Sequence, residues 1–191
     1  MSQTHSRRGR QEFGAVVPPR SAASIELEAS VLREMTETSE QTFFPIVQLY
    51  DALHELVPGA SYDVLGHGEM GDNHGLTLLT KKEIRIREDV FEAACKDDGF
   101  GRFTMCHELG HLLLHEGVGL QRSAGEMPIY MSSEWQADMF AGALLMPETL
   151  VDLEASPDEL MGIFGVSRSA AHVRLKLLKQ RKTKGATKRT W

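Results

Sequence analysis

His107-Glu108-Leu109-Gly110-His111 carries the strongest structural signal in this chain. Histidines at positions i and i+4 lie on one face of a helix, so both imidazoles can reach a single metal ion. Glu108 then lies beside that metal without binding it, where its carboxylate can accept a proton from a water molecule. The H-E-x-x-H pattern is typical of zinc proteases and predicts a metal-binding helix here.

The residues around this motif predict that the helix is buried. Apolar side chains precede it at Phe103 and Met105 and follow it at Leu112–Leu114, so the helix has apolar faces. Gly110 is a poor helix former that costs roughly 1 kcal/mol relative to alanine, and its presence between the histidines indicates that another element packs closely there. A core helix whose histidines only satisfy hydrogen bonds would leave the glutamate of the motif unexplained.

A catalytic zinc needs three protein ligands and one open position for water or substrate. The candidate third ligand is Glu134, in a segment that is predicted to form a second helix between Ser132 and Pro147. Asp138 lies four residues later and therefore on the same face, where it can accept the free N–H of a ligand histidine. The alternative interpretation of this acidic pair is a solvated face of an amphipathic helix.

His115 lies on the same helix face as His107 and His111, one turn further along. Three histidines along one straight helix rise too far to share one tetrahedral ion. We therefore predict that His115 lies beside the ligands or at the surface, outside the ligand set. His115 and Tyr130 are both candidate donors to the oxyanion that forms during peptide hydrolysis.

Two stretches carry a family resemblance. The segment His107–His115 (HELGHLLLH) and the run Glu134–Pro147, with the pattern E-x-x-A-D-x-F-A-x-x-L-L-M-P, resemble the ImmA/IrrE family of bacterial and phage metallopeptidases. The resemblance extends over about residues 40–178. It implies an α+β, zincin-like fold with a small antiparallel or mixed sheet, an active-site helix pair and a C-terminal segment that resembles a helix-turn-helix.

The resemblance also implies an activity. Family members are zinc endopeptidases that cleave helix-turn-helix repressors and so derepress phage, mobile-element, stress-response or anti-phage defence genes, and some respond to DNA damage. In this sequence His107, His111 and Glu134 match the family's Zn²⁺ ligands, and Glu108 matches its general base. Asp138 stands where the family commonly has asparagine, and an acid there can still orient a histidine. The implied substrate is a repressor protein, and DNA is a candidate activator.

Length and composition fit one intracellular domain. The chain has 191 residues, of which 41% are hydrophobic, which is enough to bury one core. Two cysteines and the lack of a signal peptide argue for a reducing compartment. The longest aliphatic runs, Leu112–Leu114 and Leu144–Met146, are far too short to span a bilayer. We therefore expect a cytoplasmic protein that does not bind membranes.

The charge is divided unevenly along the chain. The formal net charge is −6, yet residues 168–191 hold nine Lys and Arg side chains and no acidic ones. The remaining residues carry 12 basic and 27 acidic side chains. The basic C-terminal segment is either an interaction arm that contacts phosphates by a salt-sensitive attraction, or a solvated terminus that aids solubility. The sequence leaves both interpretations open.

The organisation along the chain follows from turn residues and apolar patterns. Residues 1–20 are predicted to be a disordered tail, because they hold little to bury. Residues 21–150 are predicted to form the zincin-like domain, residues 151–180 a helical pair packed on its core, and residues 181–191 a basic tail. The elements expected before the H-E-x-x-H helix are helices over 25–35 and 45–56 and strands over 62–65, 76–80 and 83–87. An edge strand of such a sheet can pair with an extended substrate backbone.

Residues 156–179 have the outline of a helix-turn-helix. A helix capped by Ser156 is followed by a turn at Gly165, and a second helix begins near Arg168 with basic residues on and beyond it. DNA binding is one interpretation of this pair. The interpretation that we favour is a pair packed on the protease core, because two helices alone have too little core to act independently.

The two cysteines receive different predictions. Cys106 directly precedes His107 and is expected to face away from the metal as a small buried hydrophobe. Cys95 is predicted to lie in a polar loop just ahead of the active-site helix. Because thiolate is a strong zinc ligand, we hypothesise that Cys95 is an inhibitory ligand that occupies the open coordination position and holds the enzyme latent.

Two other classes of function remain open. In the first, the chain is a DNA-binding transcriptional regulator that uses the zincin fold as a structural or sensing scaffold, and its DNA binding survives the loss of Glu108 or Glu134. In the second, the chain is an amide hydrolase for small molecules, with turnover that needs no protein partner. Neither class explains why a general base and a complete ligand set occur together.

Overall fold

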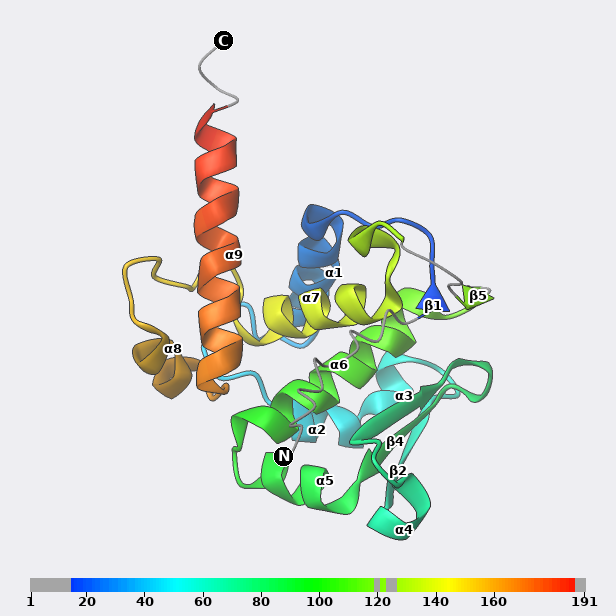
Figure 1. Cartoon of the computed structure of the whole chain (residues 1–191). Coiled ribbons are helices and arrows are strands. Elements are labelled where there is room, and N and C mark those ends of the chain that lie inside the picture. The colour runs from blue at the N-terminus through cyan, green and yellow to red at the C-terminus, as the bar shows by residue number, and fades with distance from the viewer. Residues whose placement is uncertain (1–14, 119–120, 123–126, 188–191) are drawn as a thin grey trace, which may run out of the picture.

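The computed structural model describes residues 15–118, 121–122 and 127–187, and Figure 1 shows how they are arranged. Two long helices, α6 (Gly99–His115) and α7 (Ser133–Leu145), lie side by side in the middle of the molecule. A small sheet lies on one side of α6, and the helices α8 (Pro157–Phe164) and α9 (Arg168–Thr187) lie on the other. None of the helices in this described part is long and apolar enough to cross a membrane.

The sheet has three strands, β2 (Ser61–Leu65), β4 (Glu83–Arg87) and β3 (Gly75–Leu78), with β4 in the centre. β2 runs parallel to β4 and β3 runs antiparallel to it, so the sheet is mixed. Ile84 and Ile86 point to the same face of β4 and are fully buried. β3 is the edge strand next to α6. The predicted α+β, zincin-like fold with a small mixed sheet is confirmed.

Further elements surround the sheet and the central helices. They are α1 (Ala22–Met35), α2 (Ile46–Asp51), α3 (Leu53–Leu56), α4 (His67–Met70), α5 (Glu88–Cys95) and two 3-10 turns, Leu79–Lys81 and Ile129–Met131. The helix predicted over residues 45–56 is divided at Ala52 into α2 and α3. Each end of the three predicted strands lies within two residues of the observed strand end.

Glycines of α6 allow close packing around this helix, and two of them face the neighbouring helices α5 and α7. A Cβ atom on Gly101 would lie 2.6 Å from the backbone nitrogen of Ala94 in α5, so only glycine allows these two helices to approach. A Cβ atom on Gly110 would lie 3.3 Å from Cα of Ala137 and 3.1 Å from the ring of Phe140, both in α7. The prediction that another element packs closely at Gly110 is confirmed. The element is α7, which supplies the third candidate ligand.

The C-terminal helices share the core of the rest of the molecule. Leu160 and Phe164 of α8 and Ala171 and Leu175 of α9 are buried in the same apolar cluster as α6 and α7. The guanidinium of Arg174 in α9 forms an ion pair with Glu26 of α1. α9 continues to Thr187, so residues 181–187 are helical rather than a tail, and residues 188–191 lie outside the described residues. Figure 1 shows the far half of α9 extending beyond the body.

The segment from Ala15 to Arg20 is ordered, whereas the sequence predicted a disordered tail over residues 1–20. Its first two residues form β1 (Ala15–Val16), which pairs with β5 (Gln121–Arg122). The backbone nitrogen of Val17 donates to the oxygen of Met131 at 2.9 Å, and its side chain is buried. Residues 15–20 are therefore not disordered, because they pack along the turn that precedes α7. Residues 1–14, the rest of the predicted tail, lie outside the described residues.

Candidate metal centre

Three side-chain donors converge between α6 and α7. The Nε2 atoms of His107 and His111 are 3.0 Å apart. Oε2 of Glu134 lies 3.2 Å from Nε2 of His107, and Oε1 lies 3.4 Å from Nε2 of His111. Ligands about 2.0–2.1 Å from a tetrahedral Zn²⁺ lie about 3.3 Å from one another. The three donors thus fit a zinc ion, and within the described residues they form the one cluster of this kind.

Helix geometry explains why these donors meet. His107 and His111 are one turn apart on the face of α6 that α7 covers. α7 begins at Ser133, where the hydroxyl of Ser132 accepts the backbone N–H of Trp135 as an N-cap. This cap fixes the first turn of α7, which carries Glu134, against the histidine face.

Asp138 holds His107 from the far side of the ring. Its Oδ1 accepts from Nδ1 of His107 at 2.8 Å, which leaves Nε2 for the donor cluster. Burial opposes the charge on His107, but its hydrogen bonds with Asp138 and Glu134 outweigh burial and raise its pKa to about 10 in the metal-free protein. A metal ion that binds Nε2 must therefore displace a proton from this nitrogen. Burial would raise the pKa of Glu134, but its bonds with His107 and His111 hold that pKa well below its usual range. The carboxylate of Glu134 is therefore ionised and ready to bind a cation.

His115 is buried behind His111 rather than exposed. Its Nδ1 lies 3.2 Å from Nδ1 of His111, and its Nε2 lies 3.2 Å from Oε1 of Gln136. Burial and the neighbouring His111 lower the pKa of His115 to about 4, so the ring is neutral. Both ring nitrogens have partners, which leaves no free donor for an oxyanion.

Glu108 lies against the edge strand β3. The hydroxyl of Thr77 lies 2.7 Å from Oε2 of Glu108. A Cβ atom on Gly75 would lie 2.5 Å from Cγ of Glu108, so the side chain fits only because position 75 is glycine. Sequence reasoning missed both residues. Their spacing of two along a strand, which puts both on one face, was the available signal.

A cleft of about 300 Å³ opens beside the donor cluster. Its lining includes Glu108, His111 and Glu134, together with Thr77 of β3 and Ala15 of β1. The candidate general base and two of the candidate ligands therefore face the same space, which a substrate can enter.

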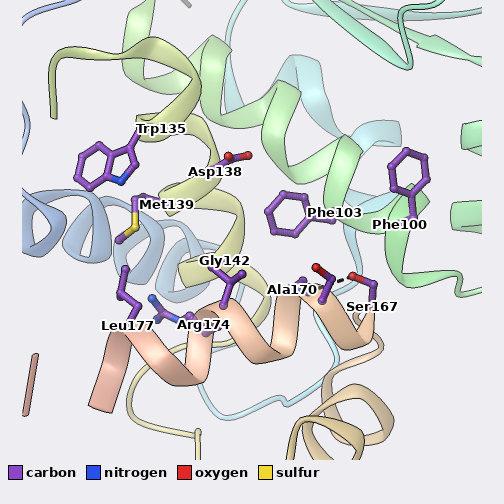
Figure 2. A pocket seen from close by; sticks show the side chains of 12 residues that line it. Phe100, Phe103, Trp135, Asp138, Met139, Gly142, Ser167, Ala170, Arg174 and Leu177 are labelled. Atoms are coloured by element: carbon purple, nitrogen blue, oxygen red, sulfur yellow. Dashed lines mark hydrogen bonds between the residues drawn. The ribbon is translucent and has the colours of Figure 1, made fainter. Parts of the chain in front are cut away.

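A second cavity has a volume of about 420 Å³, and Asp138 is among its lining residues. Figure 2 shows it between α6, α7 and α9, with Phe103, Trp135 and Leu177 around it and Asp138 at its edge. The lining is mainly apolar. Asp138 belongs both to this cavity and to the support of His107.

Three other residues singled out in the sequence lie outside the donor cluster. Cys95 is exposed at the C-terminal end of α5 and is not among the clustered donors. Cys106 is fully buried, and burial raises the pKa of its thiol to about 12. Tyr130 is half exposed in the turn before α7, and it does not line the cleft beside the donors.

Comparison with known protein families agrees with this geometry. Residues 65–176 match the model of the Peptidase_M78 family, described as the IrrE N-terminal-like domain. The matched region contains all three donors, Glu108 and Asp138. No curated protein matches the chain. The resemblance to the ImmA/IrrE family is thus confirmed over more than half of the sequence, and the chain belongs to this family of metallopeptidases.

Proposed function

We propose that the protein is a zinc-dependent endopeptidase in which His107, His111 and Glu134 hold the metal and Glu108 is the general base. The position of Glu108 carries the proposal, because its carboxylate is held by Thr77 in the cleft that His111 and Glu134 line. A structural zinc site would be closed by a fourth protein ligand. The donor cluster in the described residues has three members and adjoins a cleft.

The side chains around the cleft divide the chemical work. A bound Zn²⁺ would act as a Lewis acid that acidifies water and polarises the scissile carbonyl. Oε1 of Glu108 takes a proton from the attacking water, because Oε2 is engaged by the hydroxyl of Thr77. The same carboxyl group then returns the proton to the leaving amine. Asp138 keeps His107 turned toward the centre throughout.

The edge of the sheet supports a polypeptide substrate. β3 pairs with β4 along one edge, and in the described residues no strand pairs with its other edge. An extended chain can add to such an edge through backbone hydrogen bonds. Thr77 and Gly75 of β3 lie beside Glu108, so this addition would bring a peptide bond close to the general base.

The proposed substrate is a helix-turn-helix repressor, whose cleavage in the cytoplasm derepresses a phage, mobile-element or anti-phage defence operon. The support is membership of the ImmA/IrrE family. DNA is the proposed activator, and the exposed Lys176, Lys179 and Lys182 of α9 could contact its phosphates. Cys95 remains the proposed inhibitory ligand, and it would have to move to reach the donors.

The test uses a helix-turn-helix repressor as the substrate candidate, which a neighbouring reading frame that encodes such a protein would supply. The purified repressor is incubated with Zn²⁺-loaded wild-type protein or the Glu108→Gln variant, with and without DNA. We expect cleavage by the wild-type protein, more of it with DNA, and none by the variant, although the variant binds zinc equally well. Cleavage by Glu108→Gln would contradict the assignment of the base. If the repressor stays intact in every reaction, the proposal that it is the substrate is wrong.

A second candidate function is a DNA-binding regulator that uses the zincin fold as a scaffold. The observation in its favour is the helix–turn–helix outline of α8 and α9 with its exposed lysines. The burial of Ala171 and Leu175 shows, however, that α9 also serves the core of the molecule. Sequence-specific DNA binding that is unchanged in Glu108→Gln and Glu134→Ala, without proteolysis, would favour the regulator.

A further inference from the structure

A chain of hydrogen-bonding groups runs from His111 to the N-terminal segment. It passes from Nδ1 of His111 to Nδ1 of His115 at 3.2 Å, and from Nε2 of His115 to Oε1 of Gln136 at 3.2 Å. The side-chain nitrogen of Gln136 then lies 3.0 Å from the oxygen of Pro18 and 2.8 Å from the oxygen of Tyr130. His115 and Gln136 are almost completely buried, so water does not compete for these contacts.

The two backbone oxygens determine which way the Gln136 amide points. A carbonyl oxygen only accepts hydrogen bonds, and an amide NH₂ group has two hydrogens to donate. Pro18 and Tyr130 therefore require the NH₂ group of Gln136 on their side, which turns Oε1 toward His115. Because Oε1 only accepts, Nε2 of His115 must carry a hydrogen.

This assignment determines the protonation of His111 in turn. The ring of His115 is buried and neither of its hydrogen-bond partners is a carboxylate, so the ring is uncharged. A neutral imidazole with hydrogen on Nε2 has a bare Nδ1, so Nδ1 of His115 accepts. Nδ1 of His111 must then donate, which leaves Nε2 of His111 bare. A metal ion binds the bare nitrogen of a histidine, and Nε2 is the nitrogen that faces Nε2 of His107.

We propose that His115 and Gln136 are positioning residues that hold His111 in the tautomer that binds the metal. The backbone oxygens of Pro18 and Tyr130 determine the direction in which these hydrogen bonds are donated. The inference rests on the proposed metal centre. It also distinguishes the two ligand histidines, because His107 is supported by the carboxylate of Asp138 and His111 by neutral groups. Docking of the N-terminal segment through Pro18 is thereby connected to the metal ligand.

Nuclear magnetic resonance of ¹⁵N-labelled wild-type protein reads the tautomers directly. Two-bond ¹H–¹⁵N correlation spectra are recorded for the metal-free and the Zn²⁺-loaded forms. We expect hydrogen on Nε2 of His115 in both forms, and hydrogen on Nδ1 of His111 in the loaded form. Hydrogen on Nδ1 of His115, or zinc on Nδ1 of His111, would overturn the proposal without any variant being made.

Matched substitutions at position 115 test the consequence for metal binding. An asparagine places an amide oxygen near the position of Nδ1, whereas a glutamine reaches only the position of Nε2. We expect His115→Asn to keep a zinc affinity near that of wild type, and His115→Gln and His115→Phe to lose about 10- to 100-fold, as is usual for groups that support metal ligands. His172→Gln, on the exposed face of α9, is the control, and we expect it to leave the zinc affinity unchanged.

Gln136→Met tests the outer part of the chain, because methionine has a similar length but no amide. The expected loss of zinc affinity is again about tenfold or more, measured by competition with a chromophoric chelator. A zinc affinity equal to that of wild type in both His115→Phe and Gln136→Met would contradict the proposed chain of hydrogen-bonding groups, but not the proposed metal centre. A wild-type protein that binds no Zn²⁺ would contradict the metal centre, and the proposed function with it.

Discussion

The hydroxyl of Thr77 lies 2.7 Å from Oε2 of Glu108 and 3.0 Å from the backbone oxygen of the same residue. One side chain of the edge strand thus contacts both the carboxylate of the proposed general base and the helix that carries it. The contact holds one carboxylate oxygen and leaves Oε1 for the proposed proton transfer. The geometry of the candidate site therefore depends on β3 as much as on the H-E-x-x-H helix.

Thr77→Val removes the hydroxyl and keeps the shape of the side chain, whereas Thr77→Ser keeps the hydroxyl. A hydrogen bond to a charged group contributes about 1.5–3 kcal/mol, so Thr77→Val should lower kcat by about 10- to 100-fold. KM and zinc content should stay unchanged. Steady-state cleavage of the repressor measures both constants. If Thr77→Ser is as slow as Thr77→Val, the hydroxyl has no positioning role.

Gly75→Ala should displace the general base, because the added Cβ would lie 2.5 Å from Cγ of Glu108. The expected result is a large loss of kcat with little change in zinc affinity, since the ligands come from α6 and α7. Gly68→Ala in α4 is the matched control, because its Cβ would meet nothing within 4 Å. Equal activity in the two variants would show that Glu108 adapts to the extra atom.

The two thiols should differ sharply in reactivity. Cys95 is exposed, whereas Cys106 is fully buried with a pKa of about 12. The thiolate is the reactive form, so Cys106 should stay unmodified in the folded protein at pH 8. A colorimetric thiol assay on the metal-free protein should count one fast-reacting group in the native state and two in denaturant. Labelling of both thiols in native protein would contradict the burial of Cys106.

Cys95→Ala tests the hypothesis of an inhibitory ligand. If the thiolate of Cys95 blocks the open position of the metal, its removal should raise proteolysis in the absence of DNA. It should also change the absorption spectrum of the Co²⁺-substituted protein, because sulfur ligation gives a strong charge-transfer band. Unchanged activity and an unchanged spectrum in Cys95→Ala would remove this hypothesis.

The hydrogen bond at the start of α8 should stabilise the folded protein to an extent that depends on pH. Glu159 accepts from the backbone N–H of Ser156, and this bond lowers the pKa of the Glu159 carboxyl. A lowered pKa means that the stabilisation is present near neutrality and is lost as the pH falls through the folded-state value. The melting temperature of Glu159→Gln should therefore lie below that of wild type at pH 7, with a smaller difference at pH 3. A difference that is constant with pH would contradict this.

The parts of the site that the sequence predicted are those encoded by local periodicity. The i, i+4 spacing of His107 and His111 fixes a helix face, and the same spacing fixes Glu134 and Asp138. Gly110 signalled the approach of α7 because glycine is costly inside a helix. Each of these inferences needs only one turn of helix around the residue concerned.

The parts that the sequence did not predict depend on contacts between distant segments. Thr77 lies 31 positions from Glu108, and Pro18 lies 118 positions from Gln136. No short pattern marks such pairs, because each partner is an ordinary strand or loop residue by itself. Residues 15–20 were wrongly predicted to be disordered for the same reason, since the buried Val17 donates its backbone N–H to Met131 in the turn before α7.

The docked segment from Ala15 to Arg20 has a consequence for hydrogen exchange. The segment is held by the two-residue pairing of β1 with β5 and by backbone hydrogen bonds from Val17 to Met131 and from Arg20 to Tyr130. Because so few bonds hold it, we expect the amide of Val17 to exchange with deuterium through a local opening that leaves α6 and α7 intact. Coupling between two sites is reciprocal. Zinc that binds the docked form more tightly must therefore slow the exchange of the Val17 amide.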